Sequence, residues 1–215
     1  MTTETARIYI IDDDAEMRGS LSSLLRSTGY EVVLFASTRE FLAHAQADLP
    51  SCLVLDIRLQ AESGLEFQER LARENIRIPV VLMTGHGDIP MTVRGMKAGA
   101  IDFLPKPFRE EEMLSAVAQA IETDRARRAA DGNVGALRQR YEVLTPREKE
   151  VMGLVVTGLM NKQVAGRMNL SEITVKIHRG NVMRKMEAQS LADLVRMAEL
   201  LSIRDSSITR FGVPD

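Results

Sequence analysis

The first 122 residues alternate short apolar runs with stretches whose apolar residues recur at helical spacing. Runs such as residues 8–11 (Ile-Tyr-Ile-Ile) are too short for helices, which is typical of buried strands. Stretches such as residues 15–27 place leucines three and four positions apart, which predicts amphipathic helices. Five strand–helix pairs in succession predict an α/β fold, a doubly wound five-stranded parallel sheet with helices on both faces.

The expected elements follow from these patterns together with the turn residues between them. The expected strands are residues 8–11, 31–35, 53–55, 80–83 and 101–104. The expected helices are residues 15–27, 38 to about 47, 64–74, 88–98 and 109 to about 122. Two of the three histidines fall in this half, and both His44 and His86 are expected at the solvent-exposed surface.

Acidic residues stand where two of the expected strands end. Asp12 and Asp13 follow the first strand, and Asp56 ends the third. Because the carboxyl ends of parallel strands share one edge of a sheet, these carboxylates are expected to meet there, and their mutual repulsion favours a bound cation. Carboxylate oxygens suit Mg²⁺. The sequence therefore predicts a magnesium site, whereas Asp14 is expected only to cap the next helix.

Two more polar residues are expected at the same edge. Thr84 ends the fourth strand, and Lys106 follows the fifth. A hydroxyl and an ammonium beside metal-bound carboxylates are the groups needed for phosphoryl transfer to a carboxylate, with Asp56 as the attacking group.

The chain changes character after residue 123. Residues 124–141 are rich in Arg, Ala, Asp and Gly, and the tripeptide at 131–133 (Asp-Gly-Asn) is a break signal. The sequence leaves open whether this linker is a long helix or a flexible tether. The remainder is helical by pattern, starting with the capping box of Thr145 and Glu148. The expected helices are residues 145–158, 161–168, 171 to about 187, and one beginning at 190.

A short second helix, a tight turn and a capped third helix are typical of a helix-turn-helix. In the third helix, Val175, Val182 and Met186 form an apolar stripe that includes His178, which is expected to be packed. On the opposite face, long cations can reach phosphates and guanine edges, and an isoleucine can meet a thymine methyl. The residues expected to contact DNA are Thr174, Lys176, Ile177, Arg179, Gly180 and Arg184.

Charge and composition agree with this division. Residues 1–123 hold 19 acidic and 12 basic residues, whereas residues 124–215 hold 11 acidic and 16 basic ones, so the second half suits nucleic acid. A single cysteine, Cys52, excludes a disulfide within the chain and fits a reducing cytoplasm. We expect no signal peptide and no membrane partner, since no apolar run approaches the roughly 18–20 residues of a membrane span.

Residues 5–122 resemble the receiver domain of bacterial response regulators, whose fold is flavodoxin-like or CheY-like. The resemblance implies that Asp56 is the phosphoacceptor, and that Asp12, Asp13, Asp56 and the backbone carbonyl of Arg58 bind Mg²⁺. The matching motifs are Ile10-Ile-Asp-Asp-Asp14, Leu53-Val-Leu-Asp56, Met83-Thr-Gly-His-Gly87 and Phe103-Leu-Pro-Lys-Pro-Phe108.

The same resemblance implies that Thr84 and Lys106 bind the phosphoryl group, that Phe103 is the ring that turns inward on activation, and that the Lys106–Pro107 bond is cis.

One departure from the family pattern concerns the loop after the phosphoacceptor. The family usually has Met-Pro there, whereas this chain has Leu59-Gln60. The missing proline is expected to loosen the loop and to affect phosphoryl lifetime.

Residues 142–204 resemble the LuxR-type helix-turn-helix, and the domain order is that of NarL/FixJ response regulators, closest to the FixJ branch with the styrene-response regulators. Gly180 stands where some relatives carry a basic groove contact. The expected domains are a receiver at 1–123, a linker at 124–141 and a DNA-binding domain at 142–208. The supporting motifs are Leu144-Thr-Pro-Arg-Glu148, the run 158–165 and the run 172–185.

The resemblance implies a sensor histidine kinase, double-stranded promoter DNA and RNA polymerase as partners. It also implies a homodimer on phosphorylation, joined through the helix that begins at Ser190, and transcriptional activation.

Two rival classes of protein share some of these features. A Mg²⁺-dependent phosphatase or phosphotransferase would need a second acid near the nucleophile, where this chain has Arg58. A small-molecule sensor would have no use for the acidic edge. We therefore expect no enzyme activity beyond slow autodephosphorylation.

Overall fold

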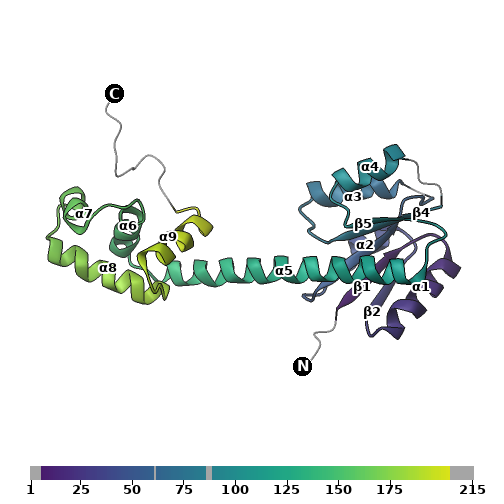
Figure 1. Ribbon diagram of the computed structural model, residues 1–215, viewed down its shortest axis with the longest axis horizontal. Helices are drawn as coiled ribbons and strands as arrows, with labels where there is room; N and C mark the ends of the chain where they lie inside the picture. The colour runs from purple at the N-terminus through teal and green to yellow at the C-terminus, as the bar shows by residue number, and fades with distance from the viewer. Residues whose placement is uncertain (1–5, 61, 86–88, 204–215) are drawn as a thin grey trace. The chain divides into compact units, whose positions relative to one another are not determined.

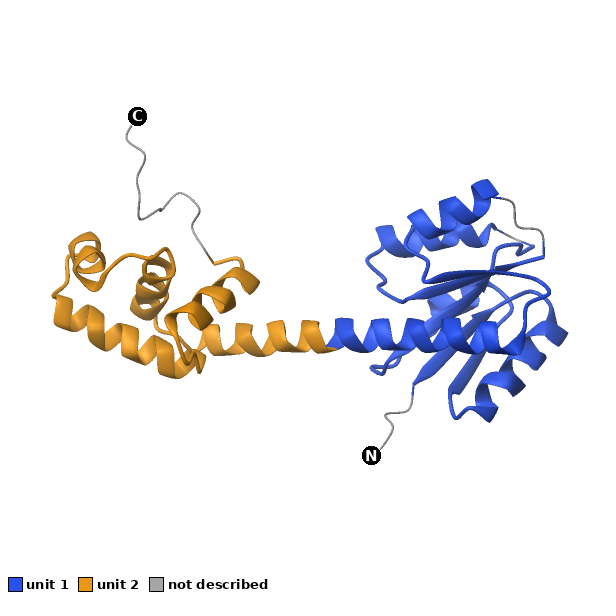
Figure 2. Cartoon of the chain, viewed as in Figure 1, with its two compact units in different colours: residues 1–128 blue, residues 129–215 orange. Residues whose placement is uncertain are grey.

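A computed structural model of the chain describes residues 6–60, 62–85 and 89–203 (Figure 1). The chain divides into two compact units, residues 1–128 and 129–215 (Figure 2). Within the described ranges, no helix combines the length and the apolar character that crossing a lipid bilayer requires.

The first unit contains a five-stranded parallel sheet with the strand order β2-β1-β3-β4-β5. The predicted doubly wound parallel fold is confirmed. Its strands are β1 (Arg7–Ile11), β2 (Glu31–Phe35), β3 (Ser51–Asp56), β4 (Val80–Thr84) and β5 (Asp102–Pro105). Its helices are α1 (Ala15–Ser27), α2 (Thr38–Ala43), α3 (Gly64–Arg73), α4 (Ile89–Lys97) and α5 (Glu110–Glu142).

Alternate residues of the central strands enter two separate apolar cores. On β1, Ile8 and Ile10 pack with α1 and α5, whereas Tyr9 and Ile11 pack with α2 and α3. This alternation follows from the period of two in a strand. Because both faces of the sheet are covered, every residue of β3 and β4 is buried.

The second unit is helical, as its sequence predicts. Thr145 and Glu148 form the predicted capping box, and Ser171 and Ser190 cap the two helices that follow them. The left-handed residue Asn169 ends the short helix before the turn. The helices are α6 (Pro146–Val155), α7 (Asn161–Met168), α8 (Glu172–Met186) and α9 (Leu191–Leu200).

Of the two alternatives that the sequence leaves open for the linker, the structure has the long helix, and α5 does not break at residues 131–133. It continues through Gly132 to Glu142 as one helix of 33 residues. A glycine in a helix costs only about 1 kcal/mol relative to alanine, and the helix is packed at both ends. Val117 and Ile121 enter the core of the first unit, and Leu137 enters the core of the second. Packing at the two ends therefore overrides the local break signal.

Helix α2 is shorter than expected, and His44 is half-buried rather than exposed. The helix ends at Ala43, and His44 turns its ring against Tyr9 and Phe35, with centroid distances of 6.0 and 5.3 Å. The hydroxyl of Tyr9 accepts the N–H of Ala47 at 3.2 Å. The aromatic cluster thus ends the helix early. The other histidine expected at the surface of this half, His86, lies outside the described residues.

Candidate functional site

The three predicted acidic residues meet at the carboxyl edge of the sheet. Asp56 is the last residue of β3, and Asp12 and Asp13 follow β1, the strand beside it. One carboxylate oxygen from each lies within 4.8 Å of the others. Asp12 and Asp56 are buried and Asp13 is half-buried, so Asp13 is the most exposed of the three acids.

Lys106 lies against two of these carboxylates. Its Nζ is 2.8 Å from Asp12 Oδ2 and 2.9 Å from Asp56 Oδ2. Burial raises the pKa of the Asp12 carboxyl, although the hydrogen bond from Lys106 lowers it in part. Burial alone would lower the pKa of Lys106, but the hydrogen bonds to Asp12 and Asp56 outweigh burial and raise it. The ammonium is therefore held in its charged form between the two acids.

The backbone around Lys106 fixes this position. The Lys106–Pro107 peptide bond is cis, as the resemblance implied. The Lys106 N–H donates to the carbonyl oxygen of Thr84 at 2.7 Å, which joins the loop after β5 to the end of β4. Thr84 itself is fully buried at that end. Phe103, on β5, is half-buried and packs against the same core as Met91 of α4.

Further contacts hold the carboxylates in place. One of these contacts was not predicted from the sequence. Asp14 caps α1 as expected, and its N–H donates to Asp12 Oδ1 at 2.8 Å. The N–H of Arg58 donates to Asp56 Oδ1 at 3.1 Å. The unforeseen residue is Arg18, whose guanidinium donates to the carbonyl oxygen of Asp12 at 2.6 Å. In the sequence, Arg18 resembles any other polar residue on the polar face of α1. Its role depends on where the loop before that helix places the carbonyl of Asp12, which the sequence does not show.

This donor set fits a hard divalent cation. Three carboxylates and one ammonium leave a net charge of −2 at the cluster, which one Mg²⁺ balances. Oxygen ligands with one side open to water are what Mg²⁺ prefers in proteins. The residues at this edge can therefore hold a magnesium ion next to Asp56.

The second unit presents helix α8 with one buried and one exposed face. Val175, Val182 and Met186 are buried against α6, α7 and α9, as the apolar stripe predicts. His178, which was expected to be packed, is half-buried. The face opposite the stripe includes Ile177, whose side chain is 59% exposed.

Four of the six residues predicted to contact DNA are exposed on α8: Lys176, Ile177, Gly180 and Arg184. Thr174 and Arg179 are half-buried, and each has a partner within the unit. The Thr174 hydroxyl lies 2.8 Å from that of Ser171, and Arg179 donates to Asn161 Oδ1 of α7 at 3.1 Å. The arrangement gives α8 an exposed basic face of the kind that enters a major groove.

Known proteins match both units. Residues 8–118 match the response regulator receiver domain, and residues 142–198 match the luxR family of bacterial regulatory proteins. Over 198 residues the chain is 59% identical to Nodulation protein W of Bradyrhizobium diazoefficiens, which covers 92% of this chain and 87% of that protein.

Two solved structures resemble the whole chain. The low-resolution structure of the response regulator StyR has a TM-score of 0.79 and 47% sequence identity, covering 91% of this chain and 98% of that one. Full-length FixJ from B. japonicum has a TM-score of 0.55 and 37% identity, covering 95% of this chain and 100% of that one.

A receiver followed by a LuxR-type DNA-binding domain is the arrangement of a response regulator that controls transcription. The two matches together cover most of the chain, and the relatives are matched over most of their own length. The chain belongs to the NarL/FixJ family of two-component response regulators.

Proposed function

We propose that Asp56 accepts a phosphoryl group from a cognate sensor histidine kinase. One oxygen of the Asp56 carboxylate attacks the phosphorus of the phosphohistidine, the bond from phosphorus to nitrogen breaks, and an acyl phosphate forms. The observation that carries the proposal is the meeting of three carboxylates with the Lys106 ammonium at one sheet edge.

Mg²⁺ would be held by Asp12, Asp13, Asp56 and the backbone carbonyl of Arg58. When bound, it supplies positive charge against the carboxylates and the incoming phosphoryl oxygens. Arg18 keeps the loop that carries Asp12 in position through the carbonyl of that residue.

Lys106 and Thr84 are proposed to bind the phosphoryl oxygens. Lys106 lies 2.9 Å from the carboxylate that would be modified, so its ammonium is within reach of a group attached there. Thr84 is buried at the end of the neighbouring strand and offers a hydroxyl donor. Phe103 is proposed to turn inward when Thr84 engages the phosphoryl group, which changes the surface formed by α4, β5 and α5.

The second unit is proposed to bind promoter DNA through Thr174, Lys176, Ile177, Arg179, Gly180 and Arg184 of α8. Phosphorylation shifts the population toward a homodimer with paired DNA-binding domains, with α9 as their contact. The dimer assists RNA polymerase at an inverted-repeat site and activates transcription. The only turnover proposed is slow loss of the phosphoryl group from Asp56, and the proposed location is the cytoplasm, where promoter DNA lies.

The proposed domain boundaries are residues 1–123, 124–141 and 142–208, of which 1–5, 61, 86–88 and 204–208 lie outside the described residues. The family matches at 8–118 and 142–198 support the first and third domains. Helix α5 spans the proposed linker.

The phosphoacceptor is tested by labelling with acetyl phosphate in Mg²⁺, followed by intact-mass measurement. The wild type should gain one phosphoryl group, and Asp56→Asn should gain none. Asp14→Asn is the matched control, because Asp14 is an exposed helix cap next to the cluster, and it should still be labelled. Labelling of the Asp56→Asn variant would place the phosphoacceptor elsewhere.

The DNA-binding surface is tested by fluorescence anisotropy with promoter fragments selected by genome-wide binding. Lys176→Ala and Arg184→Ala should each weaken binding, and each should lower the dependence of log Kd on log salt by about one unit if the lost contact is to phosphate. Arg138→Ala is the matched control, since this exposed arginine lies on α5. Equal losses in all three variants would contradict the assignment to α8.

A further inference from the structure

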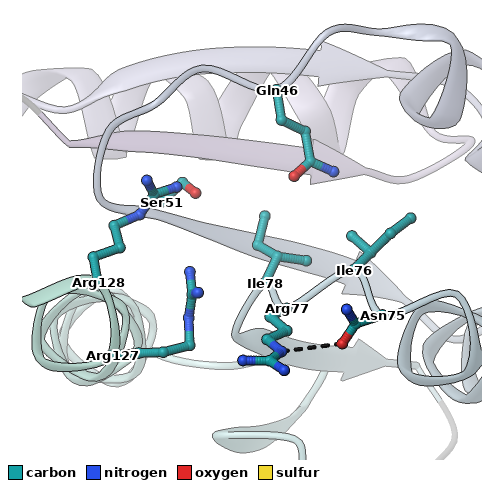
Figure 3. Close-up of a pocket in the computed structure, with 8 residues that line it drawn as sticks. All are labelled: Gln46, Ser51, Asn75, Ile76, Arg77, Ile78, Arg127 and Arg128. Carbon is teal, nitrogen blue, oxygen red and sulfur yellow. Dashed lines mark hydrogen bonds between the residues drawn. The ribbon is translucent and has the colours of Figure 1, made fainter. Parts of the chain in front are cut away.

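A basic pocket opens at the amino edge of the sheet in the first unit, opposite the edge that holds Asp56 (Figure 3). Its volume is about 360 Å³. It lies where β3 begins at Ser51 and where the chain approaches β4, beside α5. Three arginines line it: Arg77 from the segment before β4, and Arg127 and Arg128 from α5.

The remaining lining residues complete an anion-binding surface with an apolar side. Gln46 and Asn75 contribute carboxamides, and Ile76 and Ile78 contribute the apolar part (Figure 3). No carboxylate is among the described residues that line the pocket, although Asp124 and Asp48 pair with two of its arginines. The first unit as a whole is acidic, because residues 1–128 hold 20 Asp and Glu against 15 Lys and Arg. The charged side chains that line the pocket are therefore basic, although the domain as a whole is acidic.

Two of the arginines are held in position by one buried carboxylate. The side chain of Asp124 is 1% exposed, and its Oδ1 accepts from Arg127 Nη2 at 2.5 Å. Its Oδ2 accepts from Arg128 Nε at 2.7 Å and from the N–H of Ser51 at 3.0 Å. This network fixes both guanidinium groups before any ligand arrives, which reduces the entropy that binding must overcome.

The other contacts of Arg77 and Arg128 leave room for an incoming anion. The Nε of Arg77 donates to Asn75 Oδ1 at 3.1 Å, a bond that uses one of its five N–H donors. Arg128 also pairs with Asp48 at 2.6 Å, but the side chain of Asp48 is fully exposed. Exposed ion pairs contribute little to stability, so an anion with more charge can displace Asp48.

We propose that this pocket binds a phosphorylated small molecule of nucleotide size. Its phosphate groups pair with Arg77, Arg127 and Arg128, and its organic part rests on Ile76 and Ile78. Guanidinium groups suit phosphate because they offer two parallel donors to two oxygens. The volume lies in the range of known small-molecule pockets, roughly 300–1,000 Å³. The site is separate from Asp56, since it lies at the other edge of the sheet.

The test is isothermal titration of the full chain with ADP, with GDP and, separately, with inorganic phosphate. EDTA is present so that the acidic edge carries no Mg²⁺. At least one nucleotide should bind saturably at about 0.15 M salt, and more tightly than inorganic phosphate. Asp56→Asn should bind as the wild type does. Arg77→Ala should weaken binding at least tenfold, because losing one charge-assisted hydrogen bond costs about that factor or more.

Arg77→Ala is the main variant because Arg77 is exposed and has a neutral partner, so the fold stays intact. Arg127→Ala should weaken binding by a similar factor. Arg94→Ala is the matched control, since Arg94 pairs with Glu69 on the surface outside the pocket and should leave affinity unchanged. The proposal is overturned if neither nucleotide binds, if inorganic phosphate binds as tightly as they do, or if Arg77→Ala and Arg94→Ala have the same affinity.

Discussion

The Nζ of Lys185, on α8, lies 2.6 Å from Oε2 of Glu148, a residue whose side chain is 4% exposed in the first turn of α6. The same carboxylate oxygen accepts the N–H of Thr145 at 2.8 Å and closes the capping box there. One buried charge therefore joins the start of α6 to the helix that presents the proposed DNA-binding face. Loss of this pair should loosen both helices together.

We expect Lys185→Met to destabilise the second unit by about 1.5–3 kcal/mol, because the substitution leaves a buried carboxylate without its charged partner. Urea denaturation followed by far-ultraviolet circular dichroism measures the change. Arg147→Met is the matched control. Its pair with Glu150 is half-exposed on both sides, so the change should stay within about 0.5 kcal/mol. Equal losses of stability in the two variants would mean that the Lys185–Glu148 pair contributes no more than an exposed ion pair does.

The same pair predicts how stability depends on pH. Burial alone would raise the pKa of Glu148, but the hydrogen bonds from Lys185 and from the N–H of Thr145 outweigh burial and lower it. A lowered carboxyl pKa stabilises the fold above the ordinary value of 4.5, and this contribution is lost as the pH falls through the lower value in the folded state.

We therefore expect the stability difference between the wild type and Lys185→Met to be constant from pH 7 to about pH 5 and to shrink below that. Urea midpoints measured across this range for both proteins give the difference directly. Because other carboxylates titrate equally in the two proteins, their effects cancel. If the stability difference grew toward pH 3, the contribution of the Lys185–Glu148 pair would not depend on the charge of Glu148.

The acidic cluster was predictable because it needs only the order of the strands. Once residues 8–11 and 53–55 are read as parallel strands, Asp12 and Asp56 must end at the same edge. The capping box was predictable because Thr145 and Glu148 are three residues apart. The first inference needs only the place of each acid at the end of an apolar run, and the second needs only local spacing, and a sequence displays both.

Contacts between distant segments were not predictable in this way. Lys185 and Glu148 are 37 residues apart and meet only because α6 and α8 pack together. The continuity of α5 through Gly132 depends on Leu137 entering the core of the second unit, which no local pattern around Gly132 indicates. Such features follow from packing, and packing overrides a local propensity of about 1 kcal/mol.

Gly64 offers a direct test of how tightly the backbone is packed beside Asp56. A Cβ on Gly64 would lie 2.3 Å from the carbonyl oxygen of Asp56 and 2.8 Å from Cα of Ile57, both backbone atoms that no side-chain rotation can relieve. We expect Gly64→Ala to cost at least about 1–3 kcal/mol and to reduce labelling of Asp56 by acetyl phosphate. Urea denaturation and intact-mass measurement give the two results.

The matched control carries the same substitution in α1. A Cβ on Gly19 meets nothing within 4 Å, and Gly19 is exposed within the helix. We expect Gly19→Ala to stabilise the protein by about 0.5–1 kcal/mol, with labelling unchanged. If both alanines had effects of the same sign, the close approach at Gly64 would not govern the result.

Asp124 joins α5 to the start of β3, and its removal should weaken the attachment of the helix to the strand. Asp124→Ala leaves the buried N–H of Ser51 without an acceptor, and it leaves Arg127 and Arg128 without the carboxylate between them. We expect a loss of about 2–3 kcal/mol. Hydrogen exchange at the Ser51 amide should also accelerate, since Asp124 accepts the hydrogen bond from this N–H.

The control is Glu122→Ala, two residues earlier on the same helix. Glu122 pairs with Arg125, and its side chain is 68% exposed, so the change should stay within about 0.5 kcal/mol and leave exchange at Ser51 unchanged. Stability by urea and exchange by mass spectrometry distinguish the two variants. If Asp124→Ala neither lowered stability nor accelerated exchange at Ser51 relative to Glu122→Ala, the buried carboxylate would not be what holds α5 against the sheet.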